Sequence, residues 1–297
     1  MGLLAAAVVS GLAVGLLYGL FALSIVILYK STGVANFAQG NMATLFAFIV
    51  YFLAQYTGGQ MGIGLLAVLA VGVVISAVGG VAIYLLTLRI RDSAGGLNLT
   101  IRTLALYLLI FALINRYWTG GQPYRFPQLV QAGAANVFGA QVAYTTFEVL
   151  VASMVFAAAF VWFFRRTRLG LLLTGLAESA ETARLLGVSS RRMTAVAWAM
   201  ASVVALFVGV LTAQSDLLFV EMMDLFLLYA FASAIIGGGL TSLPGAFLGG
   251  AIVGVIVNVA AVYGGSDFSI LTVFVVLVVL LLVRPHGLLG EATVERF

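Results

Sequence analysis

The chain has 297 residues, of which 63% are hydrophobic and only 8% are charged. Soluble domains are usually about 45–50% apolar, so this composition excludes an ordinary soluble domain and predicts a membrane protein with several spans. The chain has no cysteine and one histidine, which excludes disulfides, thiolate catalysis, and cysteine or multi-histidine metal sites. The net charge of +4 is small and favours an orientation signal over a nucleic-acid-binding surface.

About 20 apolar residues cross the hydrocarbon core of a bilayer, and the charged residues of this chain mark the ends of such spans. The first span is too long for the apolar core of a signal peptide, so we expect it to stay in the protein. Residues 117–142 contain two prolines and several glycines and are expected to form an extramembrane loop, with Trp118 and Tyr124 as interfacial anchors. The predicted spans before and after this loop are residues 4–28, 42–55, 63–88, 97–115, 143–164, 193–213 and 268–283.

Residues 225–266 carry no charge, and their middle reads GGGLTSLPGAFLGG. This pattern predicts two short helices around residues 225–263, joined by a Gly/Pro turn, that either span as a pair or re-enter. Broken helices of this kind are a device of transport proteins. The expected fold is an all-α polytopic bundle of about eight or nine transmembrane helices, forming a single transmembrane domain over residues 1–297.

The basic residues predict the orientation of the chain. If the polar segment 165–192 is cytoplasmic, only Arg116 and Arg125 of the fourteen basic residues fall outside. This positive-inside bias predicts an outside N-terminus and a cytoplasmic C-terminus, hence an odd number of crossings. Nine crossings fit if the Gly-rich pair spans, and seven if it re-enters. The twelve inside residues are Lys30, Arg89, Arg91, Arg102, Arg165, Arg166, Arg168, Arg184, Arg191, Arg192, Arg284 and Arg296.

An ion-coupled carrier usually keeps a carboxylate, histidine or lysine within its membrane spans. Such groups are scarce in the predicted spans of this chain. The candidates all lie near predicted helix ends, which favours snorkelling or capping. We therefore expect the energy for any pumping to come from outside this chain. These candidates are Arg102, Glu148, Glu221 and Asp224.

The segment 165–192, the polar island, carries six of the fourteen basic residues. Thr174 or Ser179 is expected to cap a short helix at about Ala177–Leu186, with acidic residues at its start and Arg184 toward its end. Gly187 is expected to end that helix. The helix either presents a small-residue face to the groove of a partner or rests on the lipid headgroups.

Several motifs, in order along nearly the whole chain, resemble one known family. The sequence GLAESAETARLLGV (175–188) resembles the cytoplasmic coupling loop of ABC importer permeases, in the version of the branched-chain amino acid permeases of the LivH/LivM type. Gln39, Asn41 and Glu181 depart from the usual family pattern, which leaves the substrate subclass open. The other matching motifs are GLLYGLFAL (15–23), GVANFAQG (33–40), GGGLTSLPGAFLGG (237–250) and RPHGLLG (284–290).

The resemblance implies a set of partners in a bacterial cytoplasmic (inner) membrane. A second permease chain, LivM-like or identical, would complete the pathway, and an extracytoplasmic binding protein would deliver the solute. The chain lacks the motif Gly-x-x-x-x-Gly-Lys-[Ser/Thr], so ATP and Mg²⁺ are expected on two separate LivG/LivF-like ATPase subunits, with no cofactor and no enzyme activity here. The residues expected to couple to the ATPases are Gly175, Ala177, Glu178, Ala180, Glu181, Ala183, Leu186 and Gly187.

Two further groups of residues are predicted to carry function. Uncharged polar groups suit a solute that passes without tight binding, although each Asn equally fits a helix–helix hydrogen bond. The acidic groups are expected to dock the binding protein, or else are simply solvated. The pathway candidates are Asn36, Gln39, Asn41, Asn98, Gly237, Gly238, Gly239 and Asn258. The docking candidates are Asp216, Glu221, Asp224 and Asp267.

The function expected is that of a permease for branched-chain, hydrophobic amino acids. A urea or short-chain amide permease of the same family is the first alternative. A stand-alone channel or an ion-coupled carrier is the second.

Overall fold

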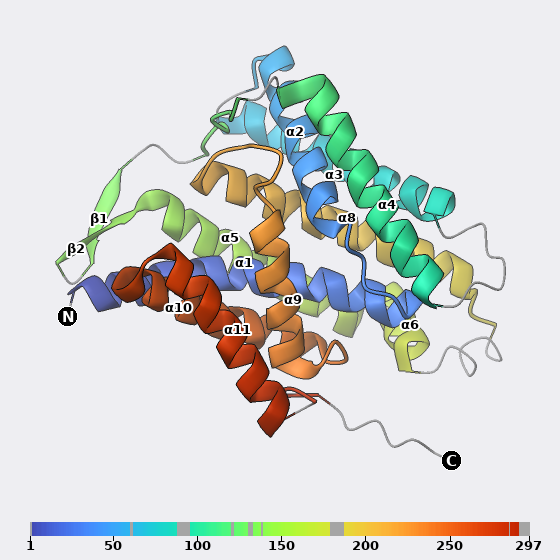
Figure 1. Cartoon of the computed structure of the whole chain (residues 1–297). Helices are drawn as coiled ribbons and strands as arrows, with labels where there is room; N and C mark the ends of the chain where they lie inside the picture. Colours follow the sequence, from blue (N-terminus) through green and yellow to red (C-terminus); the bar gives the residue numbers. More distant parts are fainter. Residues whose placement is uncertain are drawn as a thin grey trace. The chain divides into compact units, whose positions relative to one another are not determined.

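The computed structural model describes residues 2–59, 62–87, 96–119, 122–129, 133–137, 139–178, 187–284 and 286–290. These residues contain ten α-helices, one π-helix and one small sheet (Figure 1). The helices are α1 (Gly2–Thr32), α2 (Gln39–Thr57), α3 (Gly62–Thr87), α4 (Gly96–Ile114), α5 (Tyr144–Arg166), α6 (Arg168–Glu178), α8 (Ser190–Ser215), α9 (Asp224–Gly238), α10 (Leu243–Gly264) and α11 (Ser266–Val283). The π-helix η1 is Asn115–Thr119, and the strands are β1 (Ala134–Val137) and β2 (Ala140–Ala143).

Six helices of the described part are long and apolar enough to cross a membrane: α1, α3, α4 with η1, α5, α8 and α10. The all-α, multi-pass architecture predicted from composition is therefore confirmed. Within their most apolar windows α1 is 89% buried, whereas α3, α4 and α5 are each 22% buried. Helices α3, α4 and α5 thus present most of their surface outward, which only lipid tolerates for residues this apolar.

The Gly-rich region differs in part from its prediction of two short helices. Helix α9 has 15 residues, about 22 Å at 1.5 Å per residue, which is shorter than the roughly 30 Å hydrocarbon core. Helix α10 has 22 residues and is long enough to span. Its length follows from the sequence, because after Pro244 in the first turn no proline or charge interrupts the helix before Gly264.

The predicted extramembrane loop contains an antiparallel hairpin that we did not predict. Strands β1 and β2 pair Ala134 with Ala143 and Val137 with Ala140. Asn136 Oδ1 accepts the backbone N–H of Gly139 over 2.8 Å, which closes the turn. Four-residue strands are too short to give a clear alternating pattern, and for this reason sequence periodicity missed them.

The chain divides into two compact units. The first unit comprises Met1–Val26, Val130–Met154 and Leu225–Phe297, and the second comprises Ile27–Leu129 and Val155–Asp224. The prediction of a single transmembrane domain stays a prediction.

In the second unit, α2 and α3 both pack against α8 (Figure 1). Small residues set how closely these helices approach. A Cβ at Gly80 of α3 would collide with Ser202 of α8, and a Cβ at Gly209 would lie 2.5 Å from the carbonyl oxygen of Ala43 on α2. Close backbone approach through small residues is the usual way in which helices associate in lipid.

In the first unit, α10 packs against α11 and, through glycines, against α1 and α9. A Cβ at Gly250 would collide with the backbone of Gly19 on α1, and one at Gly249 would collide with the carbonyl oxygen of Ser233 on α9. The GGGLTSLPGAFLGG pattern therefore serves two close helix contacts and the turn between them.

Candidate functional site

The polar island begins with a helix that we did not predict, whereas most of the helix predicted at about Ala177–Leu186, with its alternative cap Ser179, lies outside the described residues. Helix α6 covers Arg168–Glu178, so Thr174 lies inside it and its hydroxyl donates to the Gly170 carbonyl over 3.0 Å. The prediction that Thr174 caps the coupling helix is therefore wrong. The apolar run LGLLLTGLA favours a helix from Arg168 onward, and Thr167 caps this helix by accepting the Gly170 N–H over 3.0 Å.

Most of the predicted coupling residues lie outside the part of the chain that the structure describes. Gly175 lies on α6, where no atom of the described part of the chain lies within 4 Å of an added Cβ. Gly187 has a φ of 80°, the left-handed conformation expected of a residue that ends a helix. The residues outside the described part are Ala180, Glu181, Ala183 and Leu186, together with the side chains of Ala177 and Glu178.

Helix α6 is held firmly against its neighbours in the second unit. Leu173 and Leu176 are buried, and α6 packs against α8. A Cβ at Gly170 would collide with the carbonyl oxygen of Phe163, so α6 turns back directly onto the end of α5. Displacement of the island is therefore expected to move α5 and α8 with it.

Three predicted pathway residues gather at the start of α2, and all three are buried. Asn36 Nδ2 donates to Gln39 Oε1 over 3.0 Å, and its Oδ1 accepts the N–H of Ala38. Gln39 Nε2 donates to the Ala201 carbonyl of α8 over 2.9 Å. These bonds tie the start of α2 to α8.

Asn41 is bound on one side of its amide only. Its Nδ2 donates to the Tyr107 carbonyl of α4 over 2.9 Å. Its Oδ1 is buried and has no hydrogen-bond partner among the described residues. A buried acceptor without a partner usually costs about 1–3 kcal/mol, so Asn41 Oδ1 is a natural place for a donor to bind.

The remaining pathway candidates occupy different surroundings. Asn98 is exposed on α4 of the second unit. Asn258 lies on α10 of the first unit, where its Nδ2 donates to the Gly254 carbonyl over 3.1 Å. This bond closes one turn of the same helix, as expected for a polar side chain in a membrane helix.

Gly237, Gly238 and Gly239 form the end of α9 and the turn after it. Gly239 and Leu240 both have positive φ, 58° and 67°. A Cβ at Gly237 would collide with the Gly245 carbonyl of α10. These glycines are thus used for tight packing and a turn, and their predicted role in the pathway stays a prediction.

The closing motif RPHGLLG caps the end of α9, a role that the sequence did not suggest. The N–H groups of Leu288 and Leu289 donate to the carbonyls of Ile236 and Gly237 over 2.9 and 2.8 Å. The last carbonyls of a helix have no partner within it, so this C-terminal strap (286–290) satisfies two of them. Gly287 permits the approach, with a φ of 74°.

The acidic connection between α8 and α9 brings three docking candidates together. Asp216 and Glu221 are exposed, and Asp224 accepts the Tyr107 hydroxyl at 3.3 and 3.4 Å from its two oxygens. Asp267 belongs to α11 of the first unit, and its side chain lies outside the described part.

Glu221 lines a cavity of about 420 Å³ with mixed walls. The amides of Asn115 and Gln122 share this cavity with Leu217 and Phe219. A carboxylate and two amide side chains beside apolar residues suit the chemistry of a long cationic side chain.

An aromatic cluster braces the same end of the second unit. The Trp118 ring stacks on Phe48 and Phe52 of α2, with centroids 6.2 and 6.1 Å apart. Tyr124 pairs with Leu218 in a backbone bridge of two 2.9 Å bonds, and Gln214 Nε2 donates to the Pro127 carbonyl. Trp118 and Tyr124 thus hold the loop against α2 and the acidic connection, and their predicted role as interfacial anchors stays a prediction.

These features define an integral membrane protein with several spans. No group of three or more His, Cys, Asp or Glu suited to a metal ion occurs among the described residues. The chain belongs to the family described as branched-chain amino acid transport system / permease component, whose model matches residues 7–284. The family predicted from the motifs is confirmed.

Curated relatives match over nearly their full length. The chain is 28% identical over 303 residues to the high-affinity branched-chain amino acid transport system permease protein BraD of Pseudomonas aeruginosa, covering 97% of this chain and 96% of that protein. It is 26% identical over 302 residues to the corresponding protein LivH of Escherichia coli, with the same coverage. A probable LivH of Methanocaldococcus jannaschii is 24% identical over 287 residues, covering 91% of this chain and 88% of that protein.

Among solved structures, the chain is similar to PsaBC from Streptococcus pneumoniae in complex with Fab. The TM-score is 0.50 with 12% sequence identity, over 96% of this chain and 93% of that chain. At this identity the likeness concerns the fold alone.

Proposed function

We propose that this chain is the membrane permease subunit of an ATP-driven importer and forms the translocation path for branched-chain amino acids in a bacterial cytoplasmic membrane. The observation that supports this proposal is similarity over 97% of the chain to BraD and LivH, which are named as such permeases. A second permease chain, two ATPase subunits and an extracytoplasmic binding protein complete the assembly. The chain itself carries no ATPase site, and ATP with Mg²⁺ binds to the ATPase subunits.

In this proposal the polar island receives the force of ATP binding. Closure of the two ATPase subunits draws the islands of the two permease chains together. Because α6 is packed on α8 and turned tightly against α5, this displacement moves the helices as a rigid body. ATP bound to the ATPase subunits then shifts the permease between two conformations, because the ATPase subunits bind ATP more tightly in one conformation of the complex than in the other.

The pathway proposal centres on Asn41. Its free Oδ1 supplies one acceptor for the ammonium group of a passing amino acid, whereas Asn36 and Gln39 are engaged in holding α2. One neutral acceptor binds an ammonium weakly enough for release, which suits transport.

The binding protein docks, in this proposal, on the predicted outer face at Asp216, Glu221 and Asp224. The Glu221 cavity receives a lysine or arginine side chain of that protein. Charge complementarity of this kind speeds association and fixes the register of two proteins.

Uptake by the reconstituted complex tests the proposal. The permease is placed in proteoliposomes with its partner chains, and uptake of labelled leucine, isoleucine and valine is compared with that of urea and acetamide. ATP-dependent uptake of the three amino acids supports the proposal. Uptake of urea or acetamide alone favours the amide permease, and uptake without ATP favours a channel or ion-coupled carrier.

A further inference from the structure

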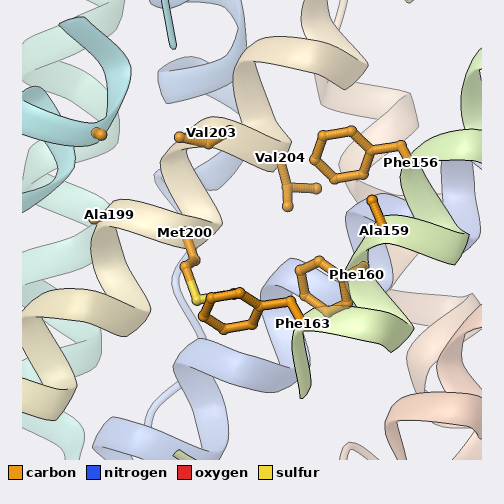
Figure 2. Close-up of a pocket in the computed structure, with 9 residues that line it drawn as sticks. Phe156, Ala159, Phe160, Phe163, Ala199, Met200, Val203 and Val204 are labelled. Carbon is orange, nitrogen blue, oxygen red and sulfur yellow. The ribbon is translucent and has the colours of Figure 1, made fainter. Parts of the chain in front are cut away.

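An apolar groove of about 300 Å³ runs along the second unit between α3, α5 and α8 (Figure 2). Phe156, Phe160 and Phe163 form its α5 wall, and Met200 and Val203 face them from α8. Figure 2 shows the Phe163 ring and the Met200 side chain directed toward one another across it. Every described residue that lines the groove has an apolar side chain, so these side chains offer no hydrogen bond to a polar ligand.

The groove opens at membrane depth. Helices α3, α5 and α8 are all long and apolar enough to span, and their lining residues lie within these helices. On α5, the neighbouring side chains Val155 and Trp162 are 64% and 63% exposed. A surface of this kind faces hydrocarbon, and a groove in it is filled by an acyl chain or by another helix.

One end of the groove leads to a cluster of exposed arginines. Arg166 follows Phe163 by three residues, about 4.5 Å along α5 and on the same face of the helix. Arg165 and Arg168 flank it at the turn into α6, and Arg192 lies about 12 Å before Met200 on α8. A phosphate at this end would meet guanidinium groups, which bind phosphate in a forked geometry.

The positive charge of the arginine cluster indicates which molecule occupies the groove. A second copy of the chain, related by an axis along the membrane normal, would bring its own arginine cluster to the same level, and the like charges would repel. An anionic lipid instead supplies the opposite charge at the basic end and an apolar chain for the groove. Basic pockets between helices on the cytoplasmic side are known to suit anionic headgroups.

We propose that the groove and its arginines form a binding site for an anionic phospholipid. One acyl chain lies between Phe156, Phe160 and Met200, and the headgroup phosphate lies on Arg165 and Arg166. The site belongs to the predicted cytoplasmic leaflet. It does not depend on which solute the protein transports.

Native mass spectrometry of the purified permease complex tests this site with two lipids of equal chains, dioleoyl phosphatidylglycerol and dioleoyl phosphatidylcholine. Wild type is expected to prefer phosphatidylglycerol about tenfold. Arg165→Gln with Arg166→Gln brings that ratio close to one, whereas Ala159→Phe, which fills the groove, weakens both lipids. The controls are Arg284→Gln, an exposed arginine elsewhere, and Val278→Phe on the exposed face of α11.

Each outcome decides the proposal. Unchanged lipid binding in Ala159→Phe, or an equal loss in Arg284→Gln, overturns it. Wild-type protein also gives a direct readout, because a phosphatidylglycerol with a photoreactive acyl chain should crosslink to α5 near Phe160. Crosslinks spread evenly over the spans, or protection of the groove by a partner chain, would also refute it. Retained lipid binding without amino acid uptake would instead count against the proposed function.

Discussion

Gly15 of α1 and Gly254 of α10 meet backbone to backbone within the first unit. A Cβ at Gly254 would collide with the Gly15 backbone, and Gly11 and Gly250 extend the same contact by one turn in each helix. In lipid, helices gain little from burying apolar surface, so such close packing carries much of their association.

Gly254→Leu is therefore expected to destabilise the permease by at least about 1–3 kcal/mol, since the added atoms force α1 and α10 apart. The measurement is the Tm of the purified protein in detergent. Gly175→Ala on α6 is the control, because no atom of the described residues lies within 4 Å of its added Cβ. A Tm for Gly254→Leu equal to that of the control would contradict the close contact.

Gly287→Ala is expected to lower the Tm more than Gly58→Ala does. Both glycines have a positive φ, 74° and 69°, so both variants carry a similar backbone strain of about 1 kcal/mol. At Gly287 the added Cβ also meets the Ile235 carbonyl at 2.7 Å, whereas at Gly58 it meets no atom of the described residues within 4 Å. The difference between the two Tm values measures how far the C-terminal strap stabilises the end of α9, and equal values would show that it contributes nothing.

The positions of the long helices could be read from the sequence. Residues 63–88 were predicted as a span, and α3 covers Gly62–Thr87; residues 143–164 were predicted, and α5 covers Tyr144–Arg166. Charged residues are costly in hydrocarbon, and they therefore mark span ends more sharply than propensity marks the ends of soluble helices.

Features that depend on tertiary contacts could not be read from the sequence. The strap caps α9 through the backbone N–H groups of Leu288 and Leu289, which carry no sequence signal. Likewise, the motif 33–40 pointed to Asn36 and Gln39 as polar residues of interest. The sequence does not show that Gln39 donates to the Ala201 carbonyl, which lies more than 160 residues further along the chain. The sequence identified the polar residues, but only the fold shows that Asn41 has a buried oxygen without a hydrogen-bond partner among the described residues.

Asn41→Leu is expected to lower amino acid uptake about tenfold while the binding protein still stimulates ATP hydrolysis. Loss of one buried hydrogen bond to the moving solute corresponds to roughly that factor. The readouts are uptake and ATPase activity in the same proteoliposomes, with Gln141→Leu at an exposed position of β2 as the control. Equal loss of uptake and stimulated ATPase activity would mean that Asn41 is structural only.

Glu221→Gln is expected to raise the concentration of binding protein needed for half-maximal uptake about tenfold at low salt. The effect should shrink as ionic strength rises, because exposed charges are screened over about 8 Å at physiological salt. Asp92→Asn removes the same charge on the predicted cytoplasmic side and serves as the control. An unchanged half-maximal concentration in Glu221→Gln would exclude the cavity as a docking point.

Glu178→Lys combined with Ala183→Arg is expected to abolish coupling between ATP hydrolysis and uptake. The two changes place bulk and positive charge on the proposed contact with the ATPase, where buried unpaired charge is strongly unfavourable. Co-purification of the ATPase subunits should fall together with uptake.

The control is Gln141→Lys with Ala143→Arg on exposed positions of β2, which adds basic side chains on the predicted outer face. Because α6 is held by Leu173 and Leu176, whose side chains stay unchanged, the Tm of the isolated permease should remain close to wild type. Intact coupling in the island variant would show that the ATPase engages another surface, and loss of coupling in both variants would point to a general effect of added charge.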